Sequence, residues 1–91
     1  MSAAPAVVSG RVVDEDESPV PRARVAFVSG PEPLPDIAAV TNDVGAFTLS
    51  ARLTGVYELE CFAEGFYPSR LRVKLSNGKT VQVTFRLTHA K

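Results

Sequence analysis

Four consecutive acidic residues at positions 14–17 form the densest group of chemically active side chains in the sequence. Calcium takes several carboxylate and carbonyl oxygens as ligands, and Asp14, Asp16 and Glu17 could supply them. The run lacks the ligand spacing of a known calcium loop, so a solvated acidic turn is the favoured interpretation. The sequence also lacks the set of cysteines and histidines that a zinc site needs. No cofactor is therefore predicted.

Nucleophilic catalysis would need a serine or cysteine beside a base. The single cysteine, Cys61, falls at an inward position of an expected strand, which predicts an inert buried thiol with no disulfide partner in the chain. The single histidine, His89, lies almost at the end of the sequence, where a solvated side chain is favoured over a catalytic one. We therefore expect a protein that is not an enzyme.

Size, composition and charge exclude several other classes of protein. The chain has 91 residues, the size of one domain, and 45% of them are hydrophobic, too many for a disordered chain. Ten acidic and ten basic residues cancel, so the positive charge of a nucleic-acid binder is absent. No apolar run approaches the ~20 residues of a membrane helix, and the first residues do not form a signal peptide. We expect a cytoplasmic protein or a fragment of an exported one, without membrane insertion.

Seven segments alternate apolar and polar residues, as strands with one buried face do, and helix signals are nearly absent. Two antiparallel sheets packed face to face would bury all of these apolar faces, so the prediction is an all-β, seven-stranded antiparallel β-sandwich. The expected strands cover residues 7–14, 22–29, 37–41, 46–50, 56–63, 70–75 and 79–88. The predicted core residues are Val8, Val12, Val25, Phe27, Phe47, Leu49, Tyr57, Leu59, Leu71, Val73, Val83 and Phe85.

Three connections have distinctive turn residues. Residues 42–45 (Asn-Asp-Val-Gly) hold the short polar side chains and the glycine that tight turns need, and they predict a hairpin of the flanking strands. Asn77 and Gly78 are an even stronger hairpin signal between the last two strands. Residues 30–36 hold a proline at every second position, which suits a stiff polyproline-like loop.

Five short stretches carry a recognisable pattern: G-R-V-V-D at 10–14, P-V-P-R-A-R-V at 19–25, T-N-D-V-G-A-F-T-L at 41–49, L-T-G-V-Y-E-L at 53–59 and A-E-G-F at 63–66. Together they resemble the carboxypeptidase regulatory-like domain. The resemblance implies the transthyretin-like (prealbumin-like) Greek-key sandwich, with one domain at residues 7–88, a flexible segment at 1–6 and a tail at 89–91. It also implies that Phe66 packs inward.

The family resemblance carries expectations about function and about surface charge. Its members are mostly non-catalytic modules attached to peptidases, receptors, adhesins and secretion components. Hydrolytic enzymes of transthyretin-like fold use several histidines and arginines and a characteristic C-terminal tail, which this chain does not match. The family's sheet order makes the second, fifth and sixth strands neighbours. The outward ladder then expected has Glu58 and Glu60 between Arg22 and Arg24 on one side and Arg70, Arg72 and Lys74 on the other.

If successive strands alternate in direction, three loops meet at one end of the sandwich: residues 14–21, 42–45 and 64–69. The other end, called the opposite pole, gathers residues 30–36, 53–55 and 76–79. Polar surface loops also carry such charges without any binding role, so both interpretations stay open. We call the first end the acidic pole, because it gathers Asp14, Glu15, Asp16, Glu17, Asp43 and Glu64 beside Phe66 and Tyr67.

The favoured function is a non-catalytic module for protein–protein contact, as a spacer or a small adaptor in a larger assembly. Loops on a rigid sandwich commonly carry recognition, and a basic partner surface would suit the acidic pole. The alternative is a ligand-binding module for calcium or carbohydrate at the same pole. A homo-oligomer through edge strands is a further option. The candidate partner-binding residues are Tyr67, Asp16, Glu17, Asp43 and Glu64 at the acidic pole, and Leu34 in the competing proline-rich loop.

Overall fold

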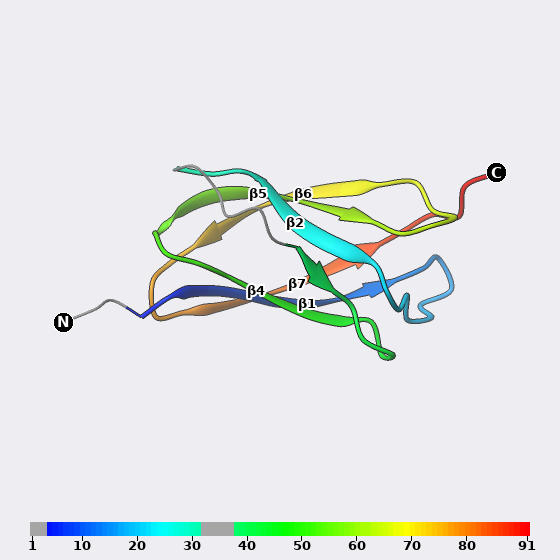
Figure 1. Cartoon of the computed structure of the whole chain (residues 1–91), viewed down its shortest axis with the longest axis horizontal. Helices are drawn as coiled ribbons and strands as arrows, with labels where there is room; N and C mark the ends of the chain where they lie inside the picture. Colours follow the sequence, from blue (N-terminus) through cyan, green and yellow to red (C-terminus); the bar gives the residue numbers. More distant parts are fainter. Residues whose placement is uncertain (1–3, 32–37) are drawn as a thin grey trace.

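The alternating segments form seven strands in two sheets packed face to face (Figure 1). The computed structural model describes residues 4–31 and 38–91, and within them there is no helix. The predicted all-β sandwich of seven strands is confirmed. The strands are β1 (Ala6–Val13), β2 (Arg24–Ser29), β3 (Ala39–Val40), β4 (Ala46–Ala51), β5 (Gly55–Phe62), β6 (Ser69–Leu75) and β7 (Thr80–Arg86).

The two sheets have three and four strands. The first has the order β4-β1-β7 and the second the order β3-β2-β5-β6. Every pairing is antiparallel except that of β1 with β7, which is parallel. This parallel pair departs from a purely antiparallel sandwich, and it follows from the alternation of strand direction, because the first and seventh strands run the same way.

Both predicted hairpins are wrong, although both turns form. Strands β3 and β4, joined by residues 41–45, lie in different sheets, and so do β6 and β7, joined by residues 76–79. At the first turn the Asn42 Oδ1 accepts the N–H groups of Val44 and Ala46 at 3.1 and 3.0 Å, and Gly45 has a φ of 77°. Turn residues fix a local reversal of the chain, but the sheet that each strand joins depends on which apolar face it must cover.

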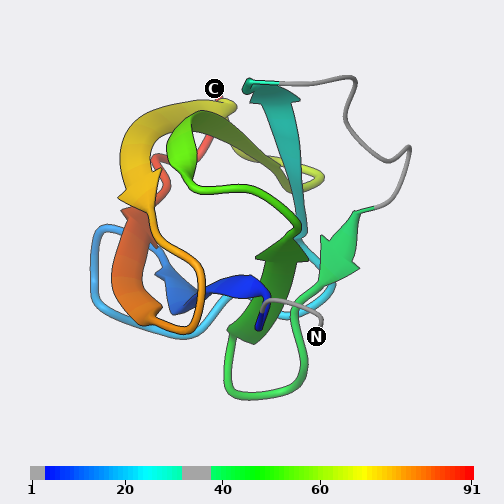
Figure 2. The same ribbon diagram turned by 90° about the vertical axis from the view of Figure 1, so that its left-hand side faces the viewer.

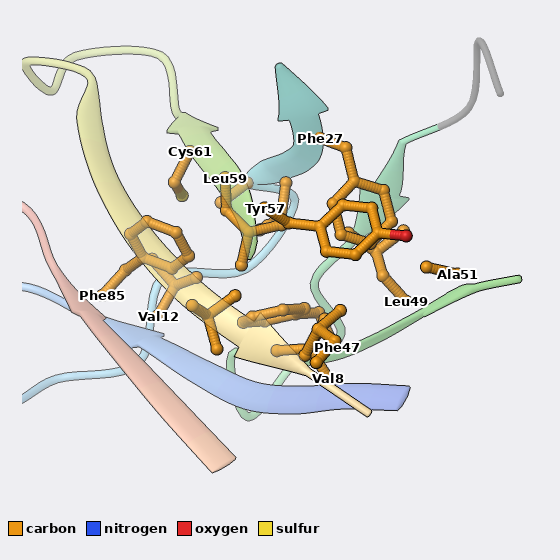
Figure 3. Packing of buried hydrophobic residues seen from close by; sticks show 14 of the residues in the cluster. Val8, Val12, Phe27, Phe47, Leu49, Ala51, Tyr57, Leu59, Cys61 and Phe85 are labelled. Carbon is orange, nitrogen blue, oxygen red and sulfur yellow. The ribbon is translucent and has the colours of Figure 1, made fainter. Parts of the chain in front are cut away.

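The inward residues of both sheets form one core (Figure 3). All the predicted core residues are buried except Leu71 and Val83, which are half-buried and pack against the core from one side. Two aromatic pairs lie within the core: Phe27 with Tyr57, with ring centroids 5.0 Å apart, and Phe47 with Phe85, at 6.0 Å. The sandwich is therefore filled by side chains along its whole length.

The outer face of the four-stranded sheet carries the predicted charge ladder in part. The Arg70 Nε lies 2.8 Å from a Glu60 carboxylate oxygen, and Arg70 Nη1 lies 3.5 Å from Glu58, which confirms the β5–β6 half for Arg70. Arg72 is opposite Glu58 in the register, whereas Lys74 is opposite Val56. The β2 half is wrong. Arg22 lies in a turn before β2 with a φ of 59°, and Arg24 is opposite Phe62 rather than a glutamate. The strand begins two residues later than the alternation indicated, because the Arg22 N–H bonds to the Thr41 carbonyl instead of to a strand.

Candidate functional site at the acidic pole

Three loops and the end of the chain meet at the acidic pole, at the right in Figure 1. Backbone hydrogen bonds join them: the Val12 N–H donates to the Gly45 carbonyl at 2.8 Å, and the Val20 N–H donates to the Val12 carbonyl at 2.9 Å. The Tyr67 N–H donates to the Thr88 carbonyl at 3.0 Å. The loops gather as the alternation of strand direction predicted, and the C-terminal residues join them, which the sequence analysis missed.

A buried threonine ties two of these loops together. The Thr41 hydroxyl donates to the Val20 carbonyl at 2.7 Å and accepts the Ala23 N–H at 2.8 Å. Only 3% of Thr41 is exposed, so both partners depend on this one hydroxyl group. The sequence gives little signal of this role beyond a threonine at the end of an extended run.

The calcium candidates have local structural roles or remain exposed. An Asp14 carboxylate oxygen accepts the N–H groups of Asp16 at 2.9 Å and Ser18 at 3.0 Å, so it holds its own loop in shape. Glu17, in the left-handed region with a φ of 66°, forms an ion pair with Arg86. The Asp16 side chain is exposed. Calcium binding by these three residues stays a prediction.

His89 is fixed against the acidic loop rather than free in solvent. The Glu15 carboxylate accepts the His89 backbone N–H at 3.2 Å, and its other oxygen lies 2.5 Å from His89 Nδ1. The imidazole packs against Phe66, with ring centroids 4.3 Å apart. Hydrogen bonds from its own backbone N–H and from that of His89 lower the pKa of Glu15. Phe66 packs against the core, as the family resemblance implied.

One group of donor atoms could hold a metal ion, and it differs from the predicted set. A carboxylate oxygen of Asp14, one of Glu15 and a ring nitrogen of His89 lie within 4.8 Å of one another. Asp16 and Glu17 are outside this group. The arrangement has only two carboxylates, and the Asp14 oxygen already accepts two backbone N–H groups, whereas calcium takes six to eight oxygen ligands.

The predicted partner-binding residues are accessible at this pole. Tyr67 is 52% exposed, and Asp16, Asp43 and Glu64 are exposed without an ion pair to any residue that the structure describes. Leu34 lies outside the described residues. Beside Glu64 is a hollow of about 400 Å³. It is lined by Asp14, Pro19, Val20, Pro21, Arg22, Ala63, Glu64 and Phe66.

A second accessible group lies nearby on the outer face of the four-stranded sheet, and the sequence analysis missed it. Phe62 and Val40 are 50% and 55% exposed, and both are paired with Arg24 on the strand between them. The signal was available, since Phe62 directly follows the inward Cys61 and must point outward. Cys61 itself is buried as predicted, and burial raises the pKa of its thiol to about 11.

The sequence matches one protein family over residues 7–88, nearly its whole length. The chain belongs to the carboxypeptidase regulatory-like domain family. No curated protein sequence matches it. Within the described residues, the structure offers no helix with the length and apolar character needed to cross a membrane.

Several solved structures share the fold. The minor pilin of Streptococcus agalactiae has a TM-score of 0.74 at 15% identity, with 100% of this chain and 47% of the pilin covered. Hydroxyquinol 1,2-dioxygenase from Pseudomonas putida has a TM-score of 0.74 at 10% identity, with 99% and 58% covered. A chain of a type II cohesin–X-dockerin complex from Acetivibrio cellulolyticus has a TM-score of 0.70 at 16% identity, with 91% of this chain and 57% of that chain covered.

This regulatory-like domain thus spans less than two thirds of each similar chain, and at these identities the likeness concerns the fold alone. That fold is the transthyretin-like β-sandwich, as predicted.

Proposed function

We propose that this chain is a non-catalytic module that binds another protein through the loops of its acidic pole, as a spacer or small adaptor in a larger assembly. The observation that carries the proposal is the half-exposed Tyr67 among loops whose carboxylates Asp16, Asp43 and Glu64 have no ion-pair partner in the described part of the chain. Aromatic residues are common anchors of protein interfaces, and accessible carboxylates favour a partner with a basic surface.

The hollow beside Glu64 supports the same site. Its lining residues include the apolar Val20 and Phe66 and the acidic Asp14 and Glu64. A lysine or arginine side chain of a partner could lay its aliphatic stem against such a lining and bring its charge to the rim. Arg22 also lines the hollow, so the orientation of an incoming cation is restricted.

Two observations support a role without catalysis. The thiol of Cys61 is fully buried, and a reactive thiol needs an accessible site and a lowered pKa rather than a raised one. His89 holds the end of the chain, since its backbone N–H bonds to Glu15 and the Ala90 N–H bonds to the Gly65 carbonyl at 2.9 Å. Among the similar folds, one is named a pilin and another is a chain of a cohesin–X-dockerin complex, names that fit contact between proteins.

The test is a binding measurement with two variants. A partner would be isolated with the immobilised chain, and its affinity compared for the double variant Tyr67→Ala with Asp16→Lys and for Leu34→Ala. We expect the double variant to lose at least about tenfold in affinity and added salt to weaken the complex. If only Leu34→Ala weakens binding, and salt has no effect, the acidic pole is not the contact surface.

Binding of calcium or carbohydrate at the acidic pole is the second candidate function. The convergence of Asp14, Glu15 and His89 favours it for a cation, and the half-exposed Tyr67 favours it for a sugar. The melting temperature with Ca²⁺, compared with Mg²⁺ and with EDTA, separates the two functions. Under the protein-contact proposal Ca²⁺ causes no more change than Mg²⁺, whereas a specific calcium site raises the melting temperature as the ion saturates it.

A further inference from the structure

The sandwich is less well covered on one side than on the other. Leu71 on β6 and Val81 and Val83 on β7 point inward, yet each is only half-buried. Strands β6 and β7 lie side by side at this edge of the two sheets, as the end view shows (Figure 2). The three-stranded sheet ends at β7, so apolar surface stays accessible where a fourth strand would cover it.

The backbone of β7 has one free edge. The Val7 N–H donates to the Lys79 carbonyl, and the Leu87 N–H donates to the Val13 carbonyl, so the odd-numbered residues of β7 direct their backbone groups toward β1. The even-numbered residues Thr80, Gln82 and Thr84 therefore direct theirs away from the sheet. Within residues 4–31 and 38–91 these groups pair with no other strand.

Two of the other three edges carry features that hinder pairing, and the third has no uncovered apolar face beside it. Strand β3 has two residues, and β6 carries the exposed cations Arg70, Arg72 and Lys74. The inward residues of β4, Phe47, Leu49 and Ala51, are already buried. Residues 80–85 of β7, like β4, contain neither a charge nor a proline, the usual devices that keep an edge from pairing. Strand β7 differs from β4 in that its inward Val81 and Val83 are only half-buried.

We propose that β7 pairs with β7 of a second copy of this chain, antiparallel about a two-fold axis at Val83, and joins the two three-stranded sheets into one of six strands. In this register Val83 faces Val83 of the other copy, and Gln82 faces Thr84. The half-buried valines of each copy then cover those of the other, and the free backbone groups of both edges become paired.

A second copy fits this edge because the edge is complementary to itself. The uncharged residues 81–85 lie opposite one another, and Arg86 falls opposite Thr80 rather than opposite a second cation, so no like charges face each other along the β7 pair. One strand pair buries less surface than a standard interface, so the dimer is expected to be weak and to form only in concentrated solution. The edge is distinct from the acidic-pole loops, so this inference goes beyond the proposed function and is tested separately.

Two matched variants test the edge in the intact chain. Gln82 on β7 and Thr48 on β4 flank the same residue, Ser9 of β1, on the same outer face. Sedimentation at about 10–500 µM is expected to show a monomer–dimer equilibrium. Gln82→Lys should weaken the dimer affinity at least about tenfold, and Thr48→Lys should leave it unchanged. Mixing Gln82→Lys with Gln82→Glu should restore the dimer. The proposal is overturned if the natural chain is a monomer at every concentration. It is also overturned if Thr48→Lys weakens the dimer as much as Gln82→Lys does, or if only Thr48→Lys weakens it.

Cross-linking tests the register. Facing residues at Val83 place their Cα atoms about 4.5 Å apart, within reach of a disulfide, whereas two copies of Val81 are about 13 Å apart. Mild oxidation should therefore convert Val83→Cys, but not Val81→Cys, into a covalent dimer. The native Cys61 is buried and does not compete. Capture of an extended peptide from another protein at this edge, with no dimer formed, would also contradict the second-copy proposal.

Discussion

At the acidic pole the buried Thr41 hydroxyl joins the loops, and carboxylates lie around them. At the opposite pole the neutral side-chain amide of Asn77 joins the loops. There the Asn77 Oδ1 accepts the backbone N–H and the hydroxyl of Thr54 at 3.1 and 2.9 Å. The Asn77 amide nitrogen donates to the carbonyls of Ala4 and Arg52 at 2.9 and 2.8 Å. One side chain therefore joins its own turn to the N-terminal segment and to the connection between β4 and β5.

The two poles differ in which polar groups are bonded within the fold. At the opposite pole the hydrogen-bonding groups of Asn77 and Thr54 are used within the fold. At the acidic pole Glu15 and Glu17 are paired, but Asp16, Asp43 and Glu64 are exposed and have no ion pair within the described ranges. A partner with a basic surface therefore has more to gain at the acidic pole than at the opposite pole, where the exposed Lys79 is a cation.

The largest expected effect tests whether the two poles share one core. Phe47 packs with Phe85 near the acidic pole, and Phe27 packs with Tyr57 near the opposite one. Phe47→Ala and Phe27→Ala should each lower the free energy of unfolding by about 3–5 kcal/mol, because each leaves a cavity in a small core. Chemical denaturation measures both. A Phe47→Ala variant with unchanged stability would show that the assigned core is wrong.

The next effect concerns the hydrogen bonds of the buried Thr41 hydroxyl, which is at the acidic pole. Thr41→Val keeps the shape of the side chain but leaves the Ala23 N–H and the Val20 carbonyl without their partner in a buried place. Unfolding free energy should fall by about 2–3 kcal/mol. Thr48→Val, at an exposed position, is the matched control and should change little. If the two substitutions lower the free energy of unfolding equally, the buried hydrogen bonds of Thr41 do not stabilise the fold more than an exposed threonine does.

A smaller effect is expected at the opposite pole. Asn77→Ala removes the hydrogen bonds to Thr54, Ala4 and Arg52, but these groups are near solvent and can bond to water instead. The expected loss is about 1–2 kcal/mol in unfolding free energy. Hydrogen exchange should show faster opening of β1 at its Ala6 end, with the acidic-pole amides unchanged. Faster exchange at both poles would mean that the two ends are not independent.

Alternation of residues along the chain was sufficient to predict the strands, and all but two of the residues predicted for the core are buried, because the side-chain period of a strand is local. The same alternation made Leu71 and Val83 core residues, and it could not show that they lie beside an uncovered edge. The turns at Asn42 and Asn77 were located correctly, but their strands belong to different sheets. A turn sequence records a local bend, whereas sheet membership depends on contacts between distant residues.

The candidate site was predictable to the same extent. Strand direction placed the acidic loops together without any knowledge of the coordinates. The contacts of His89 with Glu15 and Phe66 were not predictable, because residues far apart in sequence meet there only after the last strand has paired with the first. Tyr67, by contrast, was correctly expected to be accessible from its place in a loop beside the inward Phe66.

The smallest expected effect distinguishes the exposed carboxylate of Glu15 at the acidic pole from the buried hydroxyl of Thr41. Because folding lowers the pKa of Glu15, its ionised form stabilises the folded state. This stabilisation is complete above the ordinary pKa of 4.5 and is lost as the pH falls through the lowered value. Glu15→Gln should therefore melt at a lower temperature than the natural chain at pH 6, and the difference should shrink as the pH falls below 4.5.

The control is Asp16→Asn, which removes a neighbouring charge that makes no hydrogen bond to His89. It should not reproduce the pH-dependent difference of Glu15→Gln. Added salt should reduce the Glu15→Gln effect at pH 6, because the pair is exposed and screened, and should leave the Thr41→Val effect intact. If the Glu15→Gln difference does not shrink as the pH falls below 4.5, the glutamate acts through packing, and the acidic pole is held at its surface as the opposite pole is, without a contribution from charge.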